Sequence, residues 1–149
     1  MLYARSSVHA YRRVGIESDV AGASPHRLVH LLYDNAISSI HVARQHLEQG
    51  QVADKGQAIA KAIRIVDEGL KASLDPARGG DLAARLAALY DYMVVQLLRA
   101  NLNNDTKALE EIERLLGTLR DAWVAIDPDA SARANPAPRG ALSGGLVAA

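Results

Sequence analysis

Four long segments of this chain carry apolar residues at alternating steps of three and four, and this repeat most constrains the fold. The most regular repeat consists of Leu109, Ile112, Leu116, Leu119, Trp123 and Ile126. Such spacing places one apolar stripe along a helix, and packing against other helices buries that stripe. Connections of only a few residues join the segments, so consecutive helices run antiparallel. The sequence therefore predicts an all-α protein built on an antiparallel four-helix bundle.

Capping and helix-breaking residues predict where these helices begin and end. The predicted starts are Ser24, Asp54, Asp81 and Asp105, and the predicted ends are Gly50, Asp75–Pro76, Asn101–Asn104 and Asp127–Pro128. Ser24 is expected as an N-cap followed by Pro25, whose missing N–H is not needed in a first turn. For the second helix, Gln57 is the expected capping-box partner of Asp54.

The two ends of the chain differ from the segments between them. Residues 1–23 form a short N-terminal segment in which Tyr11 and Val14 lie on one side of one or two helical turns, too short to be stable alone. We expect it to act as a lid over an apolar groove of the free protein. Residues 24–127 form the predicted bundle. Residues 128–149 are rich in Ala, Gly, Ser and Pro, so we expect a disordered, flexible tail.

Composition excludes several classes of protein. Lys and Arg number 17, as do Asp and Glu, so no net charge attracts the chain to nucleic acid or an acidic membrane. There is no Cys, which excludes disulfides and thiolate zinc sites. No segment approaches the ~20 apolar residues that cross a bilayer, and the N-terminus lacks the apolar stretch of a secretory signal. We therefore expect a cytoplasmic protein with no nucleic-acid partner and no membrane insertion.

Residues that could support catalysis or bind a metal are sparse. His26 and His30 lie one turn apart and could bind zinc, but only Asp34 offers a third ligand. Polar residues on the outer face of a bundle are the favoured interpretation of this pair. The sequence contains neither a Gly-x-Ser-x-Gly elbow nor a phosphate-binding glycine loop. We therefore expect no enzymatic activity, no catalytic residue, no metal and no cofactor.

The phrase Leu-Tyr-Asp occurs twice, ending at Asp34 and at Asp91, each time inside a helical segment. Asp is a poor helix-interior residue, and a buried Tyr needs a hydrogen-bond partner. The phrase therefore indicates that a binding partner or a polar network contacts this part of each helix. Tyr92 follows Tyr90 by two positions, so both rings cannot face one core. Either the tyrosine rings are buried at the edge of the core with their hydroxyls exposed to solvent, or the rings border a groove that a partner helix covers.

Together with the Ser24–Pro25 start and Trp123 near the end of the last helix, the two phrases resemble the flagellin export chaperone family (FliS) over residues 3–126. The resemblance implies a small helical chaperone that binds the disordered C-terminal segment of flagellin, prevents premature polymerisation and helps present flagellin to the flagellar export gate. It also implies that the client wraps around the bundle, with short helices in apolar grooves. The corresponding partner-binding positions are Tyr3, Tyr11, Tyr33, Asp34, Tyr90 and Asp91, and Tyr92 joins them as a residue expected at a groove edge.

The alternative is a non-catalytic helical adaptor or regulatory bundle that acts through oligomerisation, for example in histidine phosphotransfer. A phosphotransfer histidine is exposed and has basic and small neighbours. His30 precedes two leucines and His41 lies between Ile40 and Val42, so both fit poorly. The resemblance favours the chaperone.

Overall fold

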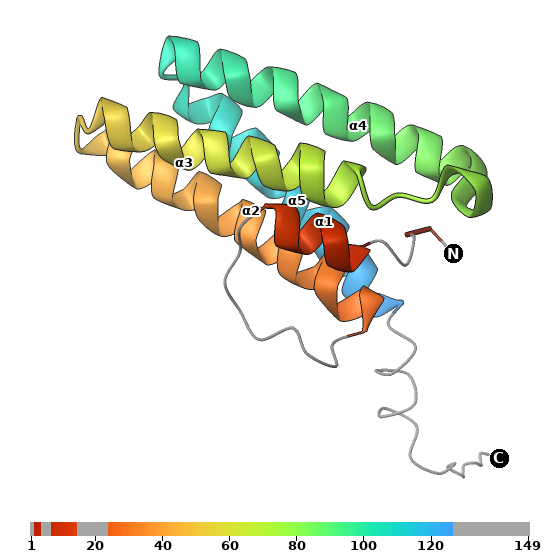
Figure 1. Cartoon of the computed structure of the whole chain (residues 1–149). Helices are drawn as coiled ribbons and strands as arrows, with labels where there is room; N and C mark the ends of the chain where they lie inside the picture. Colours follow the sequence, from red (N-terminus) through yellow and green to blue (C-terminus); the bar gives the residue numbers. More distant parts are fainter. Residues whose placement is uncertain (1, 4–6, 15–23, 127–149) are drawn as a thin grey trace, which may run out of the picture.

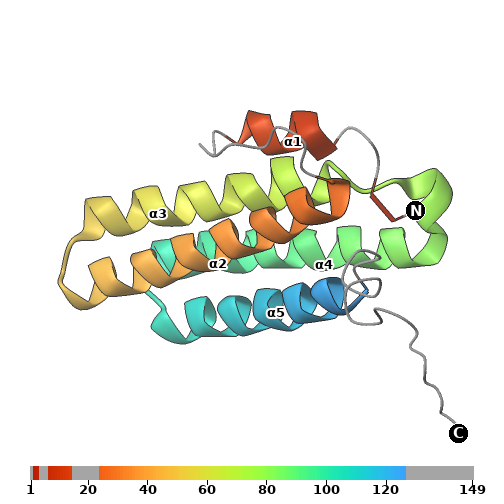
Figure 2. The same cartoon turned by 90° about the horizontal axis from the view of Figure 1, so that it is seen from below.

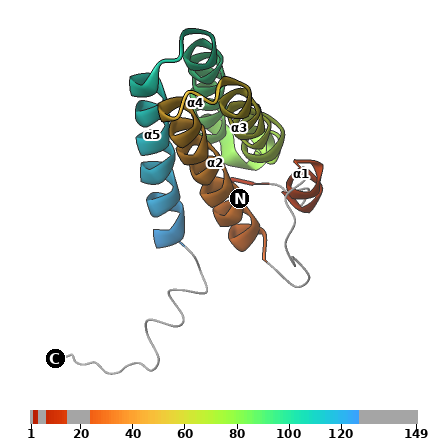
Figure 3. The same cartoon turned by 90° about the vertical axis from the view of Figure 1, so that its left-hand side faces the viewer.

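The computed structural model describes residues 2–3, 7–14 and 24–126 as a bundle of antiparallel helices. The helices are α1 (Ser7–Arg13), α2 (Pro25–Glu48), α3 (Val52–Arg64), η1 (Ile65–Lys71), α4 (Pro76–Asn103) and α5 (Thr106–Ala125). In the bundle, α2, α3 with its continuation η1, α4 and α5 each pack against the next, and α5 closes the ring on α2 (Figure 1). The short α1 lies outside this ring and contacts α2 and η1 (Figures 2 and 3). The predicted bundle is confirmed, with a short additional helix; the predicted tail lies outside the described residues.

Two of the predicted helix starts are confirmed by their caps. The Ser24 hydroxyl accepts a hydrogen bond from the Arg27 amide at 3.1 Å, and an Asp105 carboxylate oxygen accepts from the Ala108 amide at 3.1 Å. Each cap satisfies an amide that has no partner within its own helix and contributes about 1 kcal/mol. The predicted end of the first helix is also confirmed, because Gly50 follows it with a left-handed φ of 73°.

The predicted start of the second helix is wrong by one half-turn. α3 begins at Val52, not Asp54, and its N-cap Gln51 makes no side-chain capping bond. The turn at Gly50 brings the Gln51 amide to 2.8 Å from the His46 carbonyl, so the chain has already reversed before Asp54. The capping box predicted for Asp54 and Gln57 is therefore absent.

The start predicted for the third helix, about Asp81, omits a turn that precedes it in the structure. α4 begins at Pro76, where an Asp75 carboxylate oxygen accepts from the Arg78 amide at 3.2 Å. Gly80 then interrupts the helix with φ 54° and ψ −133°, and regular helix resumes at Asp81, the predicted start. The pair Asp75–Pro76 both ends one helix and begins the next. Only the end was predicted from the sequence.

The core follows the predicted stripes except at their final positions. Its largest fully buried side chains are Tyr11, Tyr90, Leu28, Leu32, Ile40, Ile59, Ile65, Leu70, Met93, Leu97, Leu109 and Ile112. At the end of α5, Trp123 is only half-buried and Ile126 is 64% exposed. Ile126 was predicted to belong to the stripe, but α5 ends at Ala125, so Ile126 does not face the bundle.

The π-helix η1 was not predicted, because its wider turn has no spacing signature in so short a segment. Gly69 allows η1 to approach its neighbours closely: a Cβ there would lie 2.9 Å from Cδ2 of Leu32 and 3.4 Å from Cγ1 of Val14. Those contacts come from α2 and from the residue that follows α1. Short π-helical turns occur frequently at functional sites, and η1 joins the bundle to its N-terminal segment.

Lys55 is buried in α3, and no carboxylate of the residues that the structure describes pairs with it. Its ammonium group donates to the Asn101 backbone carbonyl at 2.8 Å and to the Asn101 side-chain oxygen at 2.7 Å. Asn101 lies in the last turn of α4, where carbonyls lack intrahelical partners and the helix dipole is negative. Lys55 therefore caps the C-terminus of α4 from the neighbouring helix.

The substitution Lys55→Met is expected to lower the free energy of unfolding by about 2 kcal/mol, because two charge-assisted bonds are lost and the partly buried acceptors of Asn101 lose their donor. Urea unfolding followed by circular dichroism measures this loss. Lys61→Met is the matched control, since Lys61 is exposed on the same helix, and should change stability by less than about 0.5 kcal/mol. Equal effects of the two substitutions would contradict the capping role.

Candidate partner-binding site

Three tyrosines from separate parts of the chain meet inside the bundle. The Tyr90 hydroxyl of α4 lies 2.7 Å from those of Tyr3 and Tyr33, which are 3.4 Å apart. All three side chains are at most 4% exposed. The two Leu-Tyr-Asp phrases therefore meet in a polar network, as their composition indicated. The three hydroxyls are buried, which corrects the interpretation that they are exposed to solvent at the edge of the core.

Burial controls the protonation of this tyrosine cluster. It raises the pKa of Tyr3 and of Tyr90 well above the ordinary value, and it raises the pKa of Tyr33 in the same direction. A phenolate inside the cluster would lose its hydration, so each hydroxyl stays neutral and can both donate and accept. The paired hydroxyls of Tyr33 and Tyr90 can therefore form hydrogen bonds with a third hydroxyl, and Tyr3 supplies it.

The N-terminal segment is docked on the bundle at this cluster. Tyr3 forms an isolated antiparallel bridge with Leu74, and the Asp75 amide donates to the Leu2 carbonyl at 2.7 Å. The Tyr3 ring also packs edge-on against Trp123, with ring centroids 5.0 Å apart. Tyr11 in α1 is 1% exposed, so it too belongs to the core. We call the place that Leu2 and Tyr3 fill the N-terminal slot.

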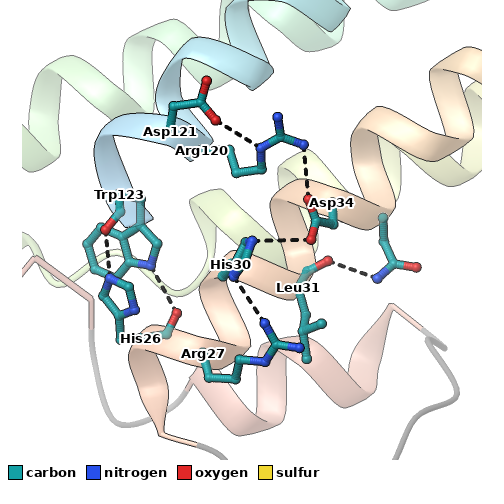
Figure 4. A network of polar contacts seen from close by, with 9 residues as sticks. His26, Arg27, His30, Leu31, Asp34, Arg120, Asp121 and Trp123 are labelled. Carbon is teal, nitrogen blue, oxygen red and sulfur yellow. Dashed lines mark hydrogen bonds and ion pairs between the residues drawn. The ribbon is translucent and has the colours of Figure 1, made fainter. Parts of the chain in front are cut away.

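Trp123 ties the end of α5 to the start of α2 through His26 (Figure 4). Its indole N–H donates to the His26 carbonyl at 2.9 Å, and the His26 Nε2 donates to the Trp123 carbonyl at 2.7 Å. The two rings also stack, with centroids 4.5 Å apart. This reciprocal contact forms one wall of the N-terminal slot, because Trp123 also contacts Tyr3.

The histidines considered as zinc ligands have other contacts. Arg27 donates to Nδ1 of His30 at 3.1 Å, so in the neutral ring Nε2 carries the proton and points at Asp34, 3.2 Å away (Figure 4). Within the described residues, no group of three or more His, Cys, Asp or Glu side chains could hold a metal ion. His26 faces Trp123 instead of joining His30.

The two aspartates of the repeated phrase lie on the surface and pair with cations from other elements. Asp34 pairs with Arg120 of α5 at 3.1 Å, and Asp91 pairs with Lys71 of η1 at 2.6 Å. In both phrases the tyrosine points inward and the aspartate outward. The sequence interpretation missed Lys71 and Arg120, because nothing in the local sequence shows which helix supplies the partner.

Tyr92 points away from the cluster that holds Tyr90. It is 41% exposed, and its hydroxyl donates to Glu111 of α5 at 3.2 Å. This confirms that the two rings cannot share one core. Partner binding by the predicted residues stays a prediction: three form the cluster, Tyr11 is buried as part of α1, and the others lie at the surface.

A hollow of about 420 Å³ with mainly apolar walls lies beside the N-terminal slot. Leu74, which forms the bridge with Tyr3, is part of its wall, and Ala83, Ala84 and Ala87 of α4 contribute small side chains. A second hollow of about 470 Å³ between α2 and α5 is lined largely by charged side chains. The first hollow can accept apolar side chains of a peptide, whereas the second favours polar contacts.

With this geometry established, comparisons with known proteins identify the family. A family model described as flagellar protein FliS matches residues 7–130. The chain belongs to the FliS family. The flagellar secretion chaperone FliS of Salmonella typhimurium is 51% identical over 130 residues, covering 87% of this chain and 96% of that relative. FliSB of Pseudomonas aeruginosa, also named a flagellar secretion chaperone, is 41% identical over 125 residues, covering 84% and 98%.

A crystal structure of a bacterial flagellar chaperone has the same fold, with a TM-score of 0.64 at 24% identity, and the match covers 79% of this chain and 94% of that one. Membership of the FliS family supports a role as a flagellar export chaperone and confirms the resemblance seen in the sequence. None of the helices in the described ranges is both long and apolar enough to span a bilayer.

Proposed function

We propose that this FliS-family protein is a cytoplasmic export chaperone that binds the disordered C-terminal segment of flagellin. Binding prevents premature polymerisation and aids delivery to the flagellar export apparatus. The observation that carries the proposal is the N-terminal slot, in which the bundle already holds an extended piece of chain through a backbone hydrogen bond and a buried tyrosine. A site of this kind suits a client that is unfolded when it binds.

The contacts in the slot are those that an extended peptide from another chain could also make. The Asp75 amide needs only a carbonyl, which any peptide supplies. The hydroxyls of Tyr33 and Tyr90 offer a polar end to an otherwise apolar site. A disordered client that becomes ordered on such a surface offsets its ordering entropy by burying apolar area.

A purified chaperone is expected to keep an equimolar amount of its cognate flagellin monomeric under conditions in which flagellin alone forms filaments. Light scattering follows filament growth, and size-exclusion chromatography detects the complex. Flagellin that lacks its C-terminal segment is the matched control and should elute separately from the chaperone. Filament growth at an unchanged rate with intact flagellin, and no shared elution, would contradict the proposal.

The N-terminal segment is proposed to act as a lid that the client displaces. A molecule whose slot is filled cannot bind until the segment leaves, so apparent affinity falls with the fraction of closed molecules. Deleting residues 1–12 is therefore expected to tighten flagellin binding or leave it unchanged, and to increase self-association of the free protein. Titration calorimetry and light scattering measure these two effects.

Trp123 reports on the lid, because it is the only Trp in the chain and packs against Tyr3. Its fluorescence should change when a Trp-free flagellin segment displaces Tyr3, and this change should be absent after the deletion. Loss of flagellin binding by a deletion variant that is still helical would show that residues 1–12 belong to the client site, and the lid would be wrong.

A further inference from the structure

Gly117 lies inside α5, although the fold gives it no reason to be a glycine. Its φ is not left-handed, and a Cβ at this position would meet no atom within 4 Å. Glycine is among the poorest helix formers, because it loses the most backbone freedom on folding. An alanine here would therefore favour the helix and would clash with nothing in the described part of the chain. The missing side chain instead leaves room beside α5.

That room belongs to the hollow of about 470 Å³ between α2 and α5, which we call the α2–α5 hollow. Gly117 and Ile37 are the uncharged residues of its lining, and Ile37 packs against the core while it stays partly exposed. Charged residues precede and follow Gly117 by one turn along α5. The charged lining residues are Arg44, Glu110, Glu113, Arg114 and Arg120.

Most charges of the α2–α5 hollow are already paired. Arg44 donates to two glutamates of α5 at 2.9 Å each, and Arg120 donates to Asp34 at 3.1 Å (Figure 4). Arg114 is exposed, and within the described residues no group accepts a hydrogen bond from its guanidinium or forms an ion pair with it. The charge of the hollow that still lacks a partner is therefore positive.

The α2–α5 hollow is separate from the N-terminal slot. Its lining comes from α2 and α5, whereas the apolar hollow beside the slot is lined by residues between 71 and 87. The two hollows share no lining residue. A peptide that occupies the slot and its apolar hollow therefore need not touch the α2–α5 hollow.

We propose that the α2–α5 hollow is the docking site of a second protein partner, which presents an apolar residue next to an acidic one. The apolar side chain fills the space beside Ile37 and Gly117, and the carboxylate pairs with Arg114. The absent side chain of Gly117 lets the backbone of the partner approach α5 closely. This inference goes beyond the proposed function, because it adds a site that stays free when the client is bound.

The test uses the isotope-labelled full-length chain and two capped peptides as probes, acetyl-Ala-Leu-Glu-Ala-amide and acetyl-Ala-Leu-Lys-Ala-amide. Nuclear magnetic resonance detects weak binding as saturable shifts of backbone amide signals. The acidic peptide is expected to shift the signals of Gly117 and Arg114 at millimolar concentration. The basic peptide should bind on the order of fivefold more weakly, because its charge opposes the unpaired guanidinium.

Gly117→Leu is expected to weaken binding of the acidic peptide on the order of tenfold, because the new side chain fills the hollow. Thr118→Leu is the matched control, since Thr118 is the next residue of α5 and is exposed, and this variant should bind like the unchanged chain. Gly117→Ala should raise the midpoint of thermal unfolding by about 3 °C, because alanine favours the helix. Circular dichroism confirms that the variants fold.

Equal binding of the two peptides, no shift at Gly117 and Arg114, or unchanged binding by Gly117→Leu would overturn this inference. A lower thermal midpoint for Gly117→Ala would overturn it as well, because the glycine would then serve the fold. Saturating the chain with the flagellin segment should leave binding of the acidic peptide unchanged. Loss of that binding would show that the client itself occupies the hollow and would overturn the second partner, while the proposed function would stand.

Discussion

Raising the pH above about 10 is expected to destabilise this protein by about 1.4 kcal/mol per pH unit for each buried tyrosine of the cluster. Burial raises the pKa of Tyr3, Tyr33 and Tyr90 above the ordinary value of 10.0. Between the pKa of the unfolded chain and that of the folded chain, the unfolded state binds fewer protons. The cluster therefore contributes its full stability below pH 10, and that contribution is lost as the pH rises through the folded pKa values.

Urea unfolding at a series of pH values between 8 and 12 measures this effect as the slope of stability against pH. Tyr33→Phe should flatten the part of the slope that the cluster contributes by about a third, because one of its three ionising groups is removed. Tyr92→Phe is the comparison: the hydrogen bond to Glu111 also raises the pKa of Tyr92, but Tyr92 is exposed and water screens this interaction, so the slope should change less than in Tyr33→Phe. The hydrogen bond to Asp91 raises the pKa of Lys71. Lys71 therefore adds a decrease of stability with rising pH that is the same in all variants. The same slope in Tyr33→Phe as in the unchanged chain would contradict the account of the cluster.

The substitution Tyr90→Ala is expected to cost about 3–5 kcal/mol of stability, because it leaves a large cavity in the core. Tyr90 is fully buried, and its hydroxyl is the one that lies 2.7 Å from both other members of the cluster. Tyr90→Phe keeps the ring and removes only that hydroxyl, so its cost should be about 1–3 kcal/mol, from two buried hydroxyls that lose a partner.

Tyr92→Ala provides the matched comparison, because Tyr92 lies two residues further along the same helix and is 41% exposed. Its expected cost is below about 0.5–1 kcal/mol. Thermal unfolding followed by circular dichroism separates the three variants. A cost for Tyr90→Phe close to zero would show that the hydroxyl cluster does not stabilise the fold, and comparable costs for the two alanine variants would contradict the burial of Tyr90.

The apolar stripes and most helix ends could be predicted because both depend on local chemistry. A serine before a proline at the start of an apolar stripe predicts an N-cap without information on the rest of the chain, and Ser24 caps its helix as expected. The start of α3 and the first turn of α4 differ from the prediction where local signals conflict. Gly50 reverses the chain so tightly that α3 begins before its acidic residue, and Asp75 begins a helix at a place interpreted only as an end.

The candidate site was harder to predict, because its contacts join residues far apart in the sequence. The repeated phrase indicated that Tyr33 and Tyr90 need partners, but the third member, Tyr3, comes from 87 residues before Tyr90. Lys55 could not be identified as buried, since its partner Asn101 lies in another helix.

The central claim is that this chain binds the C-terminal segment of flagellin, and titration calorimetry at several temperatures tests it most directly. The account predicts a one-to-one complex with a negative heat capacity change, since binding buries apolar surface. It also predicts a weak dependence on salt, because 17 basic residues balance 17 acidic ones. No interaction with cognate flagellin, together with binding of a different cytosolic protein, would contradict the claim and favour a helical adaptor.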